Sequence, residues 1–157
     1  MMHKKSWLLA ILVIFGLTAC AAMQAGQGGE QQPYLPDDVK IIPPSPDLPK
    51  EIATYSGKWV GIWPNGRRAI LVVEEIHDTW AQVLYSRTAM PYIETVYDTA
   101  GHFRLRGKVL SGPKPNIVLE KDQFKGYMYD DLYFEVKDSN TLAGRSGTAP
   151  VLMKRAD

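Results

Sequence analysis

The sequence predicts an all-β fold, a small antiparallel up-and-down β-barrel of eight to ten short strands. Apolar and polar residues alternate with period two over most of the chain after residue 50, which is typical of strands with one buried face. Turn-forming residues separate these runs at the spacing of a meander. A barrel leaves no sheet edge exposed. A two-layer β-sandwich is the alternative, and the strand count is equally compatible with it.

The first element along the chain is a predicted lipoprotein signal peptide over residues 1–19. Lys4 and Lys5 precede an apolar run from Trp7 to Leu17, which is too short to span a bilayer comfortably and has the layout of a secretory signal. The run ends in Leu-Thr-Ala followed by Cys20, the only cysteine of the chain. This ending resembles the lipobox of bacterial lipoproteins, in which the cysteine becomes the new N-terminus and carries the lipid.

The lipobox resemblance implies an attachment point and a location. Lipid chains on Cys20 would hold the protein on a membrane, because each buried methylene contributes about 0.8 kcal/mol. Residue 21 is alanine and not aspartate, which by the enterobacterial sorting rule implies the outer membrane, on its periplasmic face. We therefore expect the membrane to be the first partner of this chain.

Residues 20–50 are expected to form a tether between the lipid and the folded domain. Glycine and glutamine dominate its first part, and six prolines lie between Pro33 and Pro49. Proline lacks the amide donor and biases the preceding residue toward extended conformations. The composition therefore predicts a semi-rigid, polyproline-like spacer that extends about 3.1 Å per residue.

Charge and cysteine content limit what the remaining domain, residues 51–157, can do. Removal of the signal takes away two lysines and no acid, which leaves 16 basic against 17 acidic residues. No basic cluster offers the phosphate neutralisation that nucleic-acid binding requires. With its only cysteine at the anchor, the domain has no disulfide and no cysteine-based metal site. We expect no nucleic-acid partner, no cofactor and no metal.

Three segments of this domain show the alternation most clearly. In His102–Val109, apolar residues alternate with a basic row, which we expect to be a solvated outer face. Trp80–Ser86 and Leu132–Lys137 alternate in the same way, and no segment predicts a helix with confidence. Turns are expected at residues 64–66, 77–78, 99–101, 111–113, 121–122 and 138–140, and residues 144–147 are also assigned to a turn.

Gly57-Lys58-Trp59 and the following Gly61-Ile62-Trp63 resemble the opening strand of lipocalin-like and avidin-like barrels. In these barrels the tryptophan of Gly-x-Trp lies across the closed end. The lipocalin resemblance implies that an arginine near the chain end, Arg155 or else Lys154, packs over that ring. The longer run through Ile70–Ile76 and Ala81–Ser86 resembles a domain of uncharacterised exported bacterial proteins, which implies a fold and says almost nothing about activity.

Little in the sequence indicates catalysis. No Gly-x-Ser-x-Gly nucleophile elbow is present, and only His77 and His102 remain in the mature chain as candidate bases. Glu74 and Glu75 are adjacent in one strand, so they should point to opposite faces. We predict no enzyme and no catalytic residue, although a pocket joining one of these glutamates to His77 would favour one. The Asp130-Asp131 pair lacks the other ligands of a calcium loop.

Aromatic residues are the remaining indication of function, because barrels that hold small apolar ligands are often lined by them. The predicted site is formed by five residues: Trp59, Trp63, Tyr85, Glu74 and Arg155. A buried glutamate would need a partner such as arginine and could anchor a ligand. We therefore predict an envelope lipoprotein that binds a small apolar or amphipathic ligand. The alternative is a barrel filled by its own side chains that acts as an interaction module for another envelope protein or a hydrolase.

Overall fold

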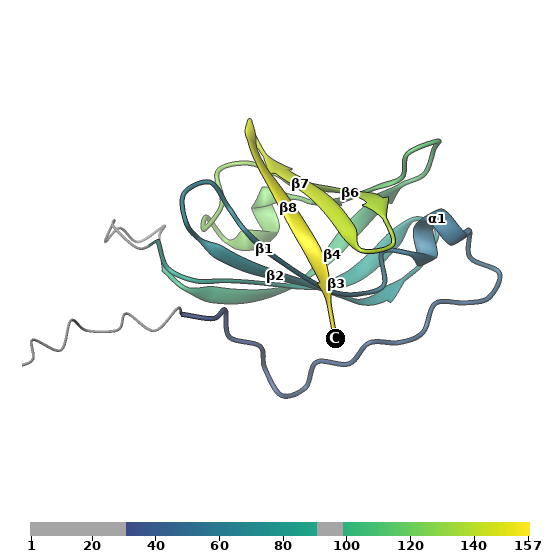
Figure 1. Ribbon diagram of the computed structural model, residues 1–157, viewed down its shortest axis with the longest axis horizontal. Helices are drawn as coiled ribbons and strands as arrows, with labels where there is room; N and C mark the ends of the chain where they lie inside the picture. The colour runs from purple at the N-terminus through teal and green to yellow at the C-terminus, as the bar shows by residue number, and fades with distance from the viewer. Residues whose placement is uncertain (1–30, 91–98) are drawn as a thin grey trace, which may run out of the picture.

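A computed structural model describes residues 31–90 and 99–157 and shows a closed eight-stranded barrel (Figure 1). Each strand is antiparallel to the next, and pairing of the first strand with the last closes the sheet. The strands are β1 (Gly57–Ile62), β2 (Arg68–Ile76), β3 (Trp80–Arg87), β4 (Gly101–Leu110), β5 (Asn116–Leu119), β6 (Leu132–Asp138), β7 (Thr141–Ser146) and β8 (Ala149–Ala156). The predicted up-and-down barrel is confirmed, and the sandwich alternative is wrong.

Period-two alternation places the side chains as predicted on β4. Leu105 and Val109 are buried inside the barrel, whereas Arg104, Arg106 and Lys108 lie on its outside. These outer cations are not simply solvated. Arg106 stacks 4.3 Å above the Trp80 ring, and Lys108 donates to Glu120 at 2.5 Å.

The turn expected at residues 144–147 is wrong for three of its four positions, because β7 continues to Ser146. Gly144 points inward, where an added Cβ would lie 2.7 Å from Val151 Cγ1 and 2.8 Å from Phe134 Cε1. This glycine therefore permits close packing within a strand. Only Gly147, with φ of 54°, supplies the left-handed conformation of the hairpin turn to β8.

One end of the barrel is closed and filled. The short helix α1 (Lys50–Ala53) lies there, and Trp59 is fully buried beneath it, with its indole N–H donated to the Tyr55 carbonyl at 2.8 Å. The Arg155 guanidinium lies 4.1 Å from the Trp59 ring. The packing implied by the lipocalin resemblance is thus confirmed for Arg155, and Lys154 instead bonds Thr141 on the surface.

Residues 34–48 run along the outside of the barrel, from the end opposite α1 back to α1 (Figure 1), and we call them the strap. Leu35 and Val39 pack against an outer apolar cluster formed by Ile70, Val72 and Leu84. The Ile42 amide donates to the Glu74 carbonyl at 2.7 Å. Over these residues the proline-rich segment therefore follows the barrel wall instead of projecting from it as a spacer.

In the part of the chain that the structure describes, no helix has the length and apolar character needed to cross a bilayer. The barrel closes within residues 57–156 and encloses its own core.

Candidate functional site

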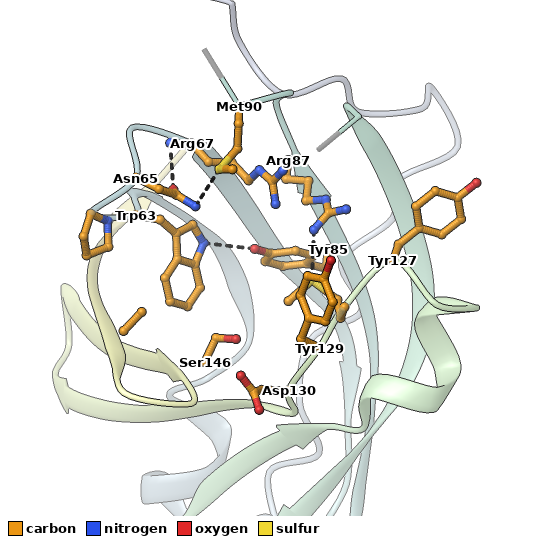
Figure 2. Close-up of a pocket in the computed structure, with 13 residues that line it drawn as sticks. Trp63, Asn65, Arg67, Tyr85, Arg87, Met90, Tyr127, Tyr129, Asp130 and Ser146 are labelled. Carbon is orange, nitrogen blue, oxygen red and sulfur yellow. Dashed lines mark hydrogen bonds between the residues drawn. The ribbon is translucent and has the colours of Figure 1, made fainter. Parts of the chain in front are cut away.

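A cavity of about 370 Å³ opens at the end of the barrel opposite α1, and Figure 2 shows the side chains that line it. Aromatic and other apolar side chains form most of its wall, and a few polar groups lie among them. Its lining residues are Trp63, Pro64, Asn65, Arg67, Tyr85, Arg87, Met90, Tyr127, Met128, Tyr129, Asp130, Ser146 and Ala149. This size and composition are typical of sites for small molecules.

Two of the predicted ligand residues meet in this cavity. The Trp63 indole N–H donates to the Tyr85 hydroxyl at 3.0 Å, and both side chains are buried. Burial raises the pKa of Tyr85 to about 12, so the phenol is neutral at physiological pH and retains its proton. The Phe124 ring packs edge-on against the Tyr85 ring, with 5.9 Å between the ring centroids, and this contact helps to orient the Tyr85 ring.

Two arginines complete this wall of the cavity. Arg67 precedes β2 and Arg87 ends β3, and both have the same strand parity as the inward residues Leu71 and Tyr85. Their exposed fractions are only 8% and 2%. The Arg87 guanidinium donates to Met128 Sδ at 2.9 Å. Both arginine side chains therefore lie in the same wall of the cavity as the Tyr85 ring, as Figure 2 shows.

The turn before β2 positions Arg67. Gly66 adopts φ of 82°, and Asn65 Oδ1 accepts a hydrogen bond from the Arg67 amide at 3.1 Å. Such an Asx turn is the local conformation that Pro-Asn-Gly favours. The turn predicted at residues 64–66 is thus confirmed, and it directs the arginine into the cavity.

The opposite wall comes from the segment between the 3₁₀ helix η2 (Lys121–Phe124) and β6. Lys125 and Gly126 have φ of 52° and 87°, and these left-handed residues turn the chain across the barrel mouth. Tyr127 and Tyr129 are 37% and 72% exposed at this rim. The acid in the described lining, Asp130, lies on this side of the cavity (Figure 2).

Trp59 and Arg155, which were also predicted to bind ligand, lie at the closed end. Besides covering Trp59, Arg155 donates to the carbonyls of Thr54, Ser56 and Ser139 at 2.6, 2.7 and 2.7 Å. An added Cβ on Gly57 would lie 2.6 Å from Arg155 Nη1, so this glycine leaves room for the guanidinium. Trp59 and Arg155 therefore close the end of the barrel, and neither of them lines the cavity.

Glu74 is buried, and its partner is an arginine as predicted, but it lies on the outer wall under the strap. Arg104 Nε donates to Glu74 Oε2 at 2.9 Å, and the same guanidinium binds both carboxylate oxygens of Asp38 at 2.9 Å. Arg104 lowers the pKa of Asp38, and the two carboxylates raise the pKa of Arg104. The Glu74 carboxylate therefore ties the strap to the barrel.

Glu75 and His77 do come together. Glu75 Oε1 lies 2.9 Å from His77 Nε2, and the Trp80 ring stacks on the imidazole at 4.1 Å. A β-bulge between Val73 and Glu75 breaks the alternation assumed for the glutamate pair. The two side chains are 36% and 44% exposed beside a shallow groove under the strap.

Nucleophilic catalysis also needs a hydroxyl or thiol bonded to the histidine. Among the described residues, none bonds to His77. The prediction that the protein is not an enzyme stays a prediction. Within residues 31–90 and 99–157, no group of three or more His, Cys, Asp or Glu side chains is arranged to hold a metal ion. Cys20 lies outside the described residues.

Comparison with known proteins leaves the site to be judged on its geometry. No protein-family model matches this chain, and neither the curated proteins nor the solved structures contain a match to it.

The sequence reasoning missed Arg67, Arg87 and the rim segment. Two steps of two residues back from Leu71 reach Arg67, and one step forward from Tyr85 reaches Arg87, so strand parity was the available signal. The rim segment follows a turn and has no alternation, and no sequence pattern marks its place over the mouth.

Proposed function

We propose that this protein is an envelope lipoprotein whose barrel binds a small apolar or amphipathic molecule in the cavity at its open end. The cavity of about 370 Å³ is the observation that carries the proposal. Trp63 and Tyr85 supply flat apolar surface, and the few polar groups beside them can orient a ligand. Unlike the surface hollow beside α1, this cavity is lined by the inward side chains Trp63 and Tyr85 of the barrel.

The membrane anchor in this proposal rests on the sequence. Leu-Thr-Ala-Cys20 supports lipidation, and Ala21 supports an outer-membrane location facing the periplasm. The strap enters the barrel surface at the cavity end, where Ser86 Oγ donates to the Tyr34 carbonyl at 2.5 Å. The N-terminal end of the strap therefore lies on the outer wall near the cavity end of the barrel.

The test is native mass spectrometry of residues 21–157, directed to the periplasm by an ordinary secretory signal and measured before and after denaturation. This chain keeps every described element, because the barrel and the strap lie within it. A small molecule released on denaturation is the expected result. The bare mass alone would favour the alternative, an interaction module for another envelope protein or hydrolase.

Two variants on one strand sharpen this test. Ser146 lines the cavity, whereas Ala143, also on β7, lies on the outward parity of that strand. Ser146→Phe should fill the cavity and abolish the bound mass. Ala143→Phe, the matched control, should retain it. Retention by both variants would place the molecule outside the cavity.

A further inference from the structure

The Tyr85 hydroxyl is a hydrogen-bond donor in the wall of the cavity. Its oxygen accepts from Trp63 Nε1 at 3.0 Å, and within residues 31–90 and 99–157 no atom accepts the proton that the hydroxyl itself carries. Figure 2 shows this oxygen directed toward Trp63, between two side chains that both line the cavity. The hydroxyl is therefore placed to donate to an atom of a molecule inside the cavity.

A molecule that fills the cavity has to satisfy this donor. Tyr85 is only 1% exposed, so an occupied cavity leaves its hydroxyl no contact with bulk solvent. A donor buried against an apolar atom costs about 1–3 kcal/mol, and a ligand that places an acceptor there avoids this cost. A site with such a buried donor discriminates strongly against analogues that lack the acceptor.

Contacts on two sides fix the position of the donor. The Phe124 ring packs edge-on against the Tyr85 ring, with 5.9 Å between the centroids, and the Trp63 indole N–H engages the oxygen. The side chain comes from the interior of β3, whose neighbouring inward residue Val83 is fully buried. A donor held in this way loses little further freedom when it binds an acceptor.

Most of the wall around this donor is apolar. Met90, Met128 and Tyr127 contribute to it, and methionine side chains adapt to ligands of different shape. The Asn65 side chain is already hydrogen-bonded, because its Nδ2 donates to Met90 Sδ at 3.1 Å and its Oδ1 accepts from the Arg67 amide. The complement of this wall is a molecule with an apolar body and an acceptor directed at Tyr85.

From this arrangement we infer that the ligand is an apolar molecule with a carbonyl-type oxygen, and that this oxygen accepts the Tyr85 hydroxyl proton. The inference rests on the proposed function and adds the chemical class of the ligand. It makes Tyr85 a specificity-determining residue, which selects a molecule with this oxygen over the hydrocarbon of the same shape.

The test compares two probes, 1-indanone and indane, which share one ring skeleton and differ in a single carbonyl group. Each is titrated by calorimetry into residues 21–157, after any co-purified molecule has been removed over a hydrophobic resin. Tyr85→Phe removes only the hydroxyl. It should weaken the binding of 1-indanone about fivefold, as expected for the loss of one neutral hydrogen bond, and should not weaken the binding of indane.

Two further variants assign this change to the hydroxyl. Because Tyr85→Phe also leaves the Trp63 N–H without its acceptor, the comparison is repeated between Trp63→Phe and Trp63→Phe/Tyr85→Phe, where the same selective loss is expected. Tyr55→Phe is the matched control, since that tyrosine binds Pro115 and Val136 at the closed end. It should leave the ratio of the two affinities unchanged, and thermal melting of each variant checks that it is folded.

The outcomes separate the two proposals. If removal of the hydroxyl changes the affinity ratio in neither background, the inference is wrong and the apolar cavity remains as a binding site. A molecule that is released from the native protein and has no such oxygen would also overturn the inference alone. Failure of both probes to bind, together with a bare native mass, would overturn the proposed function itself.

Discussion

Arg155→Lys tests how the closed end of the barrel is held. The substitution keeps the positive charge and shortens the reach of the donor group. Arg155 donates to three carbonyls and covers the Trp59 ring at 4.1 Å. A lysine ammonium lacks the planar fork and can replace about one of these bonds.

The expected loss follows from these contacts. Two lost hydrogen bonds from a charged donor, at about 1.5 kcal/mol each, lower the free energy of unfolding by about 2–3 kcal/mol. The ring contact adds little to the difference, because a lysine still interacts with the indole face. Urea unfolding of residues 21–157, monitored by tryptophan fluorescence, measures this change in the free energy of unfolding directly.

Arg145→Lys is the matched control. Arg145 lies 3.9 Å from the Tyr133 ring on the exposed face of β7, and it makes the same kind of ring contact without the three carbonyls. The free energy of unfolding of Arg145→Lys should fall by no more than about 0.5 kcal/mol. Equal losses in the two variants would refute the assignment of Arg155 to closure of the barrel.

Three further predictions concern the anchor, the strap and the packing of β7. Cys20→Ala should leave a larger precursor without lipid, detected by mass spectrometry and by its failure to incorporate labelled palmitate; normal lipidation would contradict the anchor. Arg104→Gln should lower hydrogen-exchange protection of the Ile42 amide about fivefold. Because Arg104 lowers the pKa of Asp38, this contact is complete above the ordinary carboxyl pKa and is lost as pH falls through the lowered value; protection that rises on acidification would contradict it. Gly144→Ala should destabilise the barrel by about 1–3 kcal/mol in urea unfolding, whereas Gly101→Ala, where the nearest atoms lie at 3.5 Å, should cost less than about 0.5 kcal/mol.

The alternation in β4 and the turn chemistry were enough to predict an all-β meander. The barrel was favoured because it removes exposed sheet edges, although the strand count allowed a sandwich equally well. The position of Glu74 could not be predicted in the same way. The sequence predicted that a buried glutamate would need a partner such as arginine, and Glu74 has Arg104. It lies on the outer wall, however, and not inside the barrel. The face it occupies depends on the strap above it and on the bulge that follows Val73. Neither is a property of local sequence.

The sequence contained one indication that the outer face of the barrel is covered, but it did not show which segment covers it. Residues 70–73 are all apolar, and such a run indicates a strand buried on both faces. Ile70 and Val72 point outward, where Leu35 and Val39 cover them. The composition of the proline-rich segment predicts an extended chain correctly, but it contains no information about the surface on which that chain lies.

A filled barrel and a ligand-binding barrel were posed as alternatives, and the two ends of this barrel differ in that respect. Branched and aromatic residues fill the closed half, where Trp59 and Leu71 have no exposed surface. At the open end, the inward rows of β2 and β3 change from apolar residues to arginine, with Arg67 just before β2 and Arg87 at the end of β3. Buried guanidinium groups need polar surroundings and do not interdigitate as leucines do. The change of residue type along each inward row therefore decides where core packing stops and the cavity begins.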